Sequence, residues 1–304
     1  KRSGEKELLD LDKMHFVVEE ACSELAGVSS SQIEMNADLQ FYDGMTSEEI
    51  QEILIRSAND LISLEAPNYQ FAAARLLLYG LHKKVYKRYE HQSLSQIIDD
   101  NIKRKVYDPA IKDKYSDTEL KKMNTWIKHE RNEDFTYAGL RQVVDKYLCQ
   151  DRSNGDIYET PQFMYMMIAA TLFADYPADT RLSYVKRYYD ATSLFKINIP
   201  TPVMAGVRTP IRQFASCVLV DVDDTLPSIF SSNSAIGYYI AQRAGIGINS
   251  GRTRAINSKI RGGEVAHTGV IPFLKVYEST VRSCTQNGVR GGSATTHFPI
   301  WHYE

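Results

Sequence analysis

The chain has 304 residues, of which 43% are hydrophobic and 24% are charged, and its formal net charge is −2. This composition is that of an ordinary globular protein with room for two or three domains. The near-neutral charge gives no support for non-specific nucleic-acid binding, and no apolar run is long enough to predict a membrane-spanning helix.

The cysteines are widely spaced and form no CxxC motif and no Cys/His cluster. Such spacing argues against a zinc site and against a secreted domain held together by disulfides. We therefore assign no metal ligands and expect a cytoplasmic protein whose thiols are reduced. The chain contains Cys22, Cys149, Cys217 and Cys284.

The first ninety residues predict a small helical unit. Residues 6–11 are compatible with a short strand, after which Asp12 can cap a helix that runs to about residue 26. Thr46 followed by Glu49 is a capping box and predicts a second helix start. A third helix is expected at about 69–89, apolar in its middle and basic at its end, where cations favour a helix terminus in any case.

Residues 90–200 predict helices without visible chemistry. Helix starts are expected at 116–119 and 134–137, and Asn154-Gly155 is typical of a hairpin turn. Thr160-Pro161 supplies an N-cap and a first-turn proline for an apolar helix, and a further helix is expected at 179–193. The methionines and tyrosines of the apolar helix favour core packing over a cofactor site.

The last hundred residues predict an α/β fold. Prolines near residues 200–210 favour extended chain before the first strand. Strands are expected at 215–220, 245–249 and 294–301, and helices at 226–243 and 271–284. In such folds, functional residues gather at the ends of strands.

Cys217 lies inside the first of these strands. Five of the six residues from Ala215 to Val220 are apolar or carry a thiol, which predicts a strand buried on both faces. A cysteine in such a place is usually a small hydrophobic residue. The strand leads into three acids, of which Asp224 can either accept hydrogen bonds from a ribose hydroxyl or cap the next helix.

Two loops combine glycine with arginine. Arg252, Arg254 and Arg261 share the segment 251–263, and Arg290 precedes Gly291-Gly292. Glycines let backbone N–H groups approach an anion, and arginines bind phosphate with two hydrogen bonds, although flexible surface turns have the same composition. Neither loop fits the P-loop or the Rossmann glycine pattern.

The beginning of the chain resembles the ATP-cone, a nucleotide-sensing module made of a basic turn and a small helical bundle. Lys1-Arg2-Ser3-Gly4 would be that turn. Cations that converge on triphosphate oxygens suit this module chemically. The residues that the resemblance implies for nucleotide binding are Lys1, Arg2, Glu7, Asp10, Lys13, Ser47 and Lys83.

The whole chain resembles the large (α) subunit of class I aerobic ribonucleotide reductase. The matching segments, in order, are IPTP, RTPIRQFASC, QRAGIGIN, RGGEVAHTG and SCTQNGVRGGSATTHFPIWH. The resemblance implies an ATP-cone at 1–90, a helical domain at 91–198 and the first part of a ten-stranded α/β barrel at 199–304. An anaerobic glycyl-radical reductase matches these segments less well.

The resemblance also implies an activity, the radical reduction of ribonucleoside diphosphates to deoxyribonucleotides. Cys217 would be one of two cysteines that reduce the substrate and form a disulfide, which thiol–disulfide exchange then reduces again. The implied substrate-binding residues are Thr201, Ser216, Cys217, Gly245 and Arg290. The implied site for an effector, ATP or a deoxynucleoside triphosphate with magnesium, comprises Asp224, Thr225, Leu226, Arg254, Arg261 and Gln286.

The implied partners are a metal-containing small subunit that supplies the radical, thioredoxin or glutaredoxin, and a second copy of the chain, which the helices at 226–243 and 271–284 would contact. No covalently bound cofactor is implied. The family's large subunits continue beyond the Trp-His segment, and their remaining active-site residues lie there. We therefore expect either a fragment of a large subunit or the amino-terminal piece of a subunit encoded in two parts, and the second option requires a complementary carboxy-terminal chain that completes the barrel. The alternative is a nucleotide-sensing regulatory module without catalysis.

Overall fold

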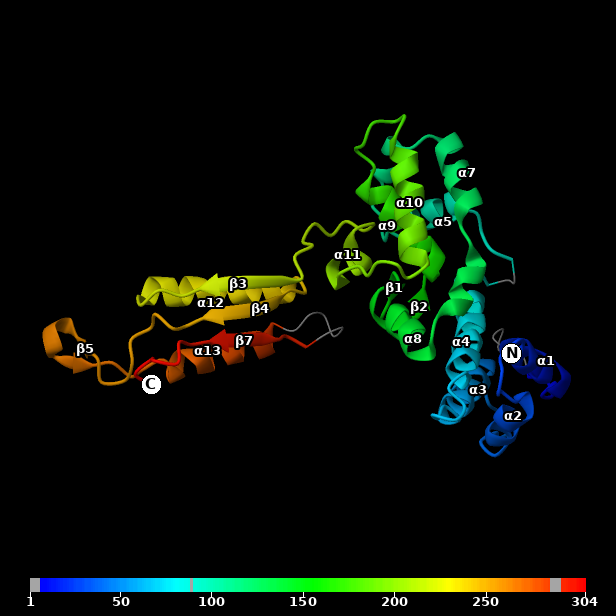
Figure 1. Cartoon of the computed structure of the whole chain (residues 1–304), viewed down its shortest axis with the longest axis horizontal. Coiled ribbons are helices and arrows are strands. Elements are labelled where there is room, and N and C mark those ends of the chain that lie inside the picture. The colour runs from blue at the N-terminus through cyan, green and yellow to red at the C-terminus, as the bar shows by residue number, and fades with distance from the viewer. Residues whose placement is uncertain (1–5, 88–89, 285–290) are drawn as a thin grey trace. The chain divides into compact units, whose positions relative to one another are not determined.

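The computed structural model describes residues 6–87, 90–284 and 291–304 and divides the chain into two compact units. The first unit comprises Lys1–Ile199 and Val207–Pro210, and the second comprises Pro200–Gly206 and Ile211–Glu304. Figure 1 shows that the first unit is built of helices and that the second holds a small sheet with helices along it. No helix within the described ranges is long and apolar enough to cross a membrane.

The first unit begins with a bundle of four helices. They are α1 (Leu11–Cys22), α2 (Ser30–Asp38), α3 (Ser47–Asp60) and α4 (Tyr69–Tyr86). The capping box at α3 is confirmed: Thr46 Oγ1 accepts a hydrogen bond from Glu49 N at 3.2 Å, and Thr46 N donates to Glu49 Oε2 at 2.8 Å.

The strand expected at residues 6–11 is wrong, as is the cap at Asp12. Residues 6–10 have no regular structure, and α1 begins two residues earlier than predicted, at Leu11. Asp10 has extended backbone angles and its side chain accepts a hydrogen bond from Lys13 N at 3.1 Å. Asp10 therefore caps α1, because its carboxylate satisfies an N–H group of the first turn that the helix leaves unpaired.

The rest of the first unit packs around α9 (Pro161–Leu172), whose residues from Pro161 to Ala170 are all buried. This burial confirms core packing for the methionine cluster. The elements around it are α5 (Leu94–Lys103), α6 (Ile111–Lys114), α7 (Asp117–Trp126), the 3-10 helix η1 (His129–Asp134), α8 (Tyr137–Lys146), the hairpin β1 (Gln150–Asp151) and β2 (Asp156–Ile157), and α10 (Arg181–Ser193). The helix start predicted at 116–119 is confirmed, with Ser116 and Glu119 forming a capping box, and the predicted hairpin is confirmed.

Three histidines meet near the end of α4. The rings of His91 and His129 stack with their centroids 3.8 Å apart, and the ring of His82 lies 5.0 Å from that of His91. Burial, followed by the charge of the neighbouring histidines, lowers the pKa of His82 to about 4 and that of His129 to about 3. The folded protein therefore holds both rings in their neutral form at pH 6.

We expect these histidines to make the first unit less stable in mild acid. An unfolded histidine has a pKa near 6.5, so below that pH the unfolded chain binds more protons than the folded chain. The stabilisation is fully present above about pH 6.5 and is lost as the pH falls towards the lowered values. Between pH 7 and pH 5, the melting temperature of the wild type should fall roughly 5 °C more than that of a His82→Gln/His129→Gln variant, as followed by circular dichroism. Parallel curves for the two proteins would contradict this expectation.

The second unit contains a parallel sheet with the strand order β3 (Cys217–Asp221), β4 (Gly245–Asn249), β7 (Ala294–His297). The helices α12 (Leu226–Ala241) and α13 (Ile271–Ser283) pack against each other and against one face of this sheet (Figure 1). The core between them is formed by Val222, Ile229, Ile236, Ile240, Ala244, Ile246, Ile248, Tyr277 and Val281. The remaining elements are α11 (Thr201–Gly206), β5 (Lys259–Ile260), η2 (Arg261–Gly263) and β6 (Val265–Ala266). The sheet is open, which fits the first part of a barrel.

Two expectations for this unit are wrong. The strand of Cys217 is not buried on both faces, because α12 and α13 cover only one face of the sheet. Successive side chains of a strand point to opposite faces, so Val218 and Val220 pack against the core while Cys217 is exposed and Leu219 is 84% exposed. The proline-containing segment after residue 199 is also not extended throughout, since Thr201 begins α11, a helix whose first turn accepts a proline.

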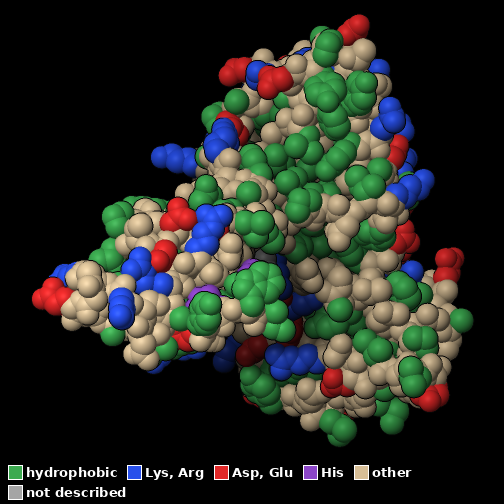
Figure 2. Space-filling model, turned by 60° about the vertical axis from the view of Figure 1, so that its left-hand side comes forward, with side chains coloured by type: hydrophobic (Ala, Val, Ile, Leu, Met, Phe, Trp, Pro, Cys, Tyr) green, Lys and Arg blue, Asp and Glu red, His purple; other side chains and the backbone are tan. Residues whose placement is uncertain are grey.

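The surface mixes side chains of all types. Figure 2 shows one face of the molecule, on which hydrophobic side chains lie among lysines, arginines and acids. Several large hydrophobic side chains of α12 are exposed, among them Phe230 at 53% and Tyr238 at 73%. Scattered exposure of this kind is normal, whereas a continuous apolar face is a candidate interface.

Candidate functional site

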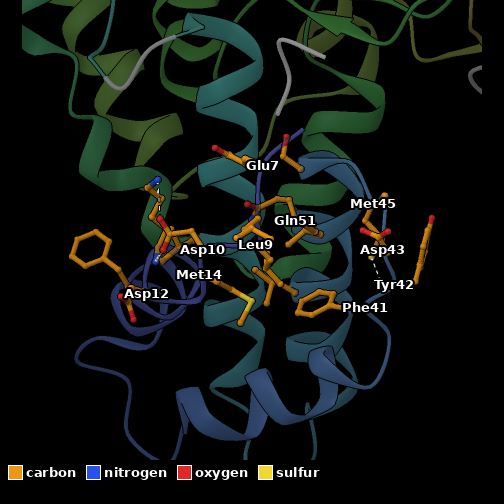
Figure 3. Close-up of a pocket in the computed structure, with 18 of the residues that line it drawn as sticks. Glu7, Leu9, Asp10, Asp12, Met14, Phe41, Tyr42, Asp43, Met45 and Gln51 are labelled. Carbon is orange, nitrogen blue, oxygen red and sulfur yellow. Dashed lines mark hydrogen bonds and ion pairs between the residues drawn. The ribbon is translucent and has the colours of Figure 1, made fainter. Parts of the chain in front are cut away.

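The four-helix bundle of the first unit contains a cavity of about 950 Å³. Figure 3 shows Asp10 and Met14 on one side of it, Phe41 and Tyr42 on the other, and Gln51 between them. The predicted cone residues Glu7, Asp10, Lys13, Ser47 and Lys83 all line this cavity. The predicted Lys1 and Arg2 lie outside the described residues.

The cavity combines two lysines and an apolar wall with the carboxylates of Glu7, Asp10, Asp12 and Asp43. Lys13 Nζ lies 2.9 Å from Asp10 Oδ2, and this pairing raises the pKa of Lys13 and lowers that of Asp10. Lys83 Nζ lies 3.9 Å from the centre of the Tyr79 ring. The cations can bind phosphate oxygens and the apolar wall can hold a base or a sugar, so the cavity suits a nucleotide in size and chemistry.

Sequence reasoning missed the apolar wall of this cavity. Phe41, Tyr42 and Met45 line it from the loop before α3, and Met14 lines it from α1. The available signal was an aromatic pair placed just before the capping box at Thr46. A loop that is tied to a helix start can present aromatic side chains in a fixed position.

A second candidate region is the exposed face of the sheet in the second unit. Cys217 pairs in register with Gly245, and Leu219 pairs with Gly247. A Cβ atom on Gly247 would come within 2.6 Å of Leu219 Cδ2, and one on Gly245 would lie 3.8 Å from Cys217 Sγ. Gly245 therefore leaves the backbone beside the thiol without a side chain, as close approach of a ligand requires, whereas the side chain of Leu219 fills the space over Gly247.

The structure brings part of the predicted substrate site together. Gly245 N donates a hydrogen bond to Ser216 O at 2.9 Å, so Ser216, Cys217 and Gly245 are neighbours on two adjacent strands. Thr201 begins α11 in the same unit. Arg290 lies outside the described residues, so its predicted place in this site is not described.

The third candidate region lies where β3 ends. Asp224 Oδ2 is 2.6 Å from Arg254 Nε, and Asp224 Oδ1 accepts a hydrogen bond from Arg254 N at 3.0 Å. Asp224 does not cap α12, because Thr225 takes that role and its hydroxyl accepts from Ser228 N at 3.2 Å. Leu226 is the first residue of α12 and is 59% exposed.

Arg252 binds the other two acids of this region. Its Nη2 lies 2.9 Å from Asp221 Oδ2 and its Nη1 lies 2.9 Å from Asp223 Oδ1. The predicted Arg261 is exposed in η2, and the predicted Gln286 lies outside the described residues. Carboxylates and guanidinium groups gathered in this way can bind ribose hydroxyls and phosphates. Within the described ranges, no group of three or more His, Cys, Asp or Glu side chains could hold a metal ion.

Three family models match the chain in succession. The ATP cone domain matches residues 1–84, the all-alpha domain of ribonucleotide reductase matches residues 133–212, and the ribonucleotide reductase barrel domain matches residues 215–304. The two reductase models together match more than half of the chain.

Curated relatives align with the entire chain. It is 50% identical over 304 residues to the ribonucleoside-diphosphate reductase 1 subunit alpha of Escherichia coli K12, and 50% identical to the corresponding subunit alpha of Haemophilus influenzae. It is 46% identical over 306 residues to the subunit alpha of Enterobacteria phage T4. These alignments cover 100% of this chain and 40% of each relative. On these matches, the chain belongs to the family of ribonucleotide reductase large subunits and carries its ATP-cone, its helical domain and the start of its barrel.

Proposed function

We propose that this chain is the amino-terminal part of a ribonucleoside-diphosphate reductase large subunit, which converts ribonucleoside diphosphates to deoxyribonucleoside diphosphates under the control of nucleotide effectors. The observation that carries the proposal is the placement of Cys217. Its thiol is exposed on the face of the sheet that α12 and α13 do not cover. A thiol that delivers reducing equivalents to a substrate needs such access.

The proposed role of Cys217 is to be oxidised while the substrate is reduced. Its thiol and that of a second cysteine would form a disulfide, which releases two electrons and two protons to the ribose. Thioredoxin or glutaredoxin would then reduce the disulfide by thiol–disulfide exchange. A metal-containing small subunit would supply the radical that starts the reaction. Thr201, Ser216, Gly245 and Arg290 would hold the substrate beside the thiol.

Two effector sites are proposed. Asp224, Arg254 and Arg261, with Thr225, Leu226 and Gln286, would bind the deoxynucleoside triphosphate or ATP that selects the substrate. The cone cavity would bind a nucleotide through Lys13 and Lys83, with Lys1 and Arg2 contributing from the turn. A second copy of the chain would pack against α12 and α13, and the exposed Phe230 and Tyr238 of α12 suit a dimer contact.

Reconstitution tests this proposal. The chain is combined with a polypeptide that corresponds to the remaining part of the relatives and with a radical-generating small subunit, and formation of deoxycytidine diphosphate from cytidine diphosphate is measured by chromatography. We expect reduction in the complete mixture and none when this chain is omitted. Binding of effectors without any reduction would contradict the proposal and would favour a nucleotide-sensing module without catalysis.

A further inference from the structure

The segment that follows β7 runs alongside the loop that carries Arg252 and Arg254. Successive residues of one segment contact successive residues of the other, in the same chain direction as the parallel pair β4 and β7. The first contact is the hydrogen bond that Ser250 N donates to His297 O at 3.2 Å, and next to it Gly251 lies so close to Pro299 that a Cβ atom would collide. Further along, His302 Nε2 lies 2.8 Å from Thr253 O. Finally, Glu304 Oε2 accepts a hydrogen bond from Ile256 N at 3.1 Å. Ile256, the loop residue of the last contact, lies two positions after Arg254.

Glu304 joins this loop to α13. The same carboxylate oxygen, Oε2, also accepts a hydrogen bond from Val270 N at 3.0 Å, directly before the first residue of α13. Figure 1 shows the end of the chain beside the first turn of that helix. The first N–H groups of a helix have no partner within the helix, and its N-terminus favours negative charge. Backbone hydrogen bonds, that of Val270 above all, lower the pKa of Glu304, so the side chain is ionised at neutral pH.

Gly269 makes room for this carboxylate. Its φ of +87° is in the left-handed region, and a Cβ atom on it would collide with the Glu304 carboxylate. A residue with a side chain at position 269 would therefore be strained and would also displace Glu304. The contact between Glu304 and the start of α13 thus depends on Gly269 as well as on Glu304.

We propose that Glu304 is a positioning residue of the effector site. Its carboxylate holds the backbone of the Arg254 loop at a fixed place relative to α13, and Arg254 in turn reaches Asp224 through its side chain and its N–H group. Glu304 itself lies at the backbone of this loop and not among the arginines, so it acts through them. The inference rests on the proposed effector site at Asp224 and Arg254.

Binding of thymidine triphosphate to the full chain, measured by equilibrium dialysis, tests the inference. The binding that is lost in Arg254→Ala, compared with the wild type, is first taken as the binding at the proposed effector site and not in the cone cavity. Glu304→Ala is expected to weaken that binding about tenfold, because the ionised acceptor that joins Ile256 N of the loop to Val270 N at the start of α13 is lost. Glu304→Gln, which keeps one acceptor oxygen and loses the charge, should have a smaller effect of roughly threefold. Glu264→Ala is the matched control, since it removes an exposed carboxylate between η2 and β6 and should leave binding unchanged.

Two outcomes are kept apart by this design. If Arg254→Ala binds like the wild type, the proposed effector site is wrong. If Arg254→Ala loses binding but Glu304→Ala does not, the effector site stands and the inference about Glu304 is overturned.

Gly269→Ala gives a second measure that does not change the carboxylate itself. It should weaken binding as Glu304→Ala does, and the double variant should be no weaker than either single variant, because both remove the same contact. Additive losses would overturn the inference. Thermal unfolding of each variant is followed in parallel. If the loss of affinity disappears at temperatures well below the melting transition, it is caused by unfolding alone, and the inference about Glu304 is overturned.

Discussion

Replacing Glu159 with alanine is expected to lower the free energy of unfolding of the first unit by about 3–5 kcal/mol, a large part of the stability of a typical domain. The side chains of Glu159 and Arg208 are both completely buried. Arg208 Nε donates to Glu159 Oε1 at 3.0 Å and to Oε2 at 2.9 Å, and a further close contact joins Arg208 Nη2 to Oε1. The variant would leave the Arg208 charge buried without its carboxylate partner.

Two further donors depend on the same carboxylate. The Tyr107 hydroxyl donates to Glu159 Oε2, and Cys149 N donates to Oε1 at 2.7 Å. Burial, followed by the charge of Glu159, raises the pKa of Tyr107, so its hydroxyl remains a donor over the whole working pH range. Each buried donor that loses its acceptor adds its own desolvation cost.

Urea denaturation followed by circular dichroism measures this loss. The matched control is Asp175→Ala, which removes the carboxylate of an ion pair with Lys114 whose aspartate side chain is 82% exposed. An exposed pair of this kind contributes about 0–1 kcal/mol. We expect the buried ion pair to hold the segment Val207–Pro210 in the first unit. If Glu159→Ala lowered the free energy of unfolding no more than the control does, this expectation would be contradicted.

Local signals in the sequence predicted local structure well. The capping box at Thr46 and the helix start at Ser116 were confirmed because such signals need only residues three positions apart. The strand at Gly245–Asn249 was confirmed with the predicted bounds. In each case, the atoms that determine the structure belong to neighbours in the sequence.

The features that sequence reasoning missed depend on distant residues. Glu159 and Arg208 are 49 positions apart, so nothing near either residue indicates the pair. Cys217 was expected to be buried because its strand is almost wholly apolar, but burial depends on which elements cover each face of the sheet, and that is not contained in a six-residue pattern. The contact between Glu304 and Ile256 spans 48 positions and depends in addition on the conformation of Gly269.

The second large effect concerns Cys217. In the reconstituted enzyme, Cys217→Ser is expected to lower the rate of multiple-turnover reduction by about a thousandfold or more, because serine cannot form the disulfide that carries the two electrons. Binding of effectors should be unchanged, since Cys217 begins β3 while Asp224 lies beyond its end. Formation of deoxycytidine diphosphate and binding of thymidine triphosphate are measured on the same preparation.

The matched control for this variant is Cys22→Ser. Burial raises the pKa of the Cys22 thiol to about 11, so it is almost entirely protonated at neutral pH and a poor nucleophile for disulfide exchange. Cys22→Ser should therefore reduce substrate at the wild-type rate. Unchanged turnover in Cys217→Ser would contradict the proposed role of this thiol. Loss of reduction together with intact effector binding would instead support the proposed separation of the two functions, with Cys217 at the start of β3 and Asp224 beyond its end.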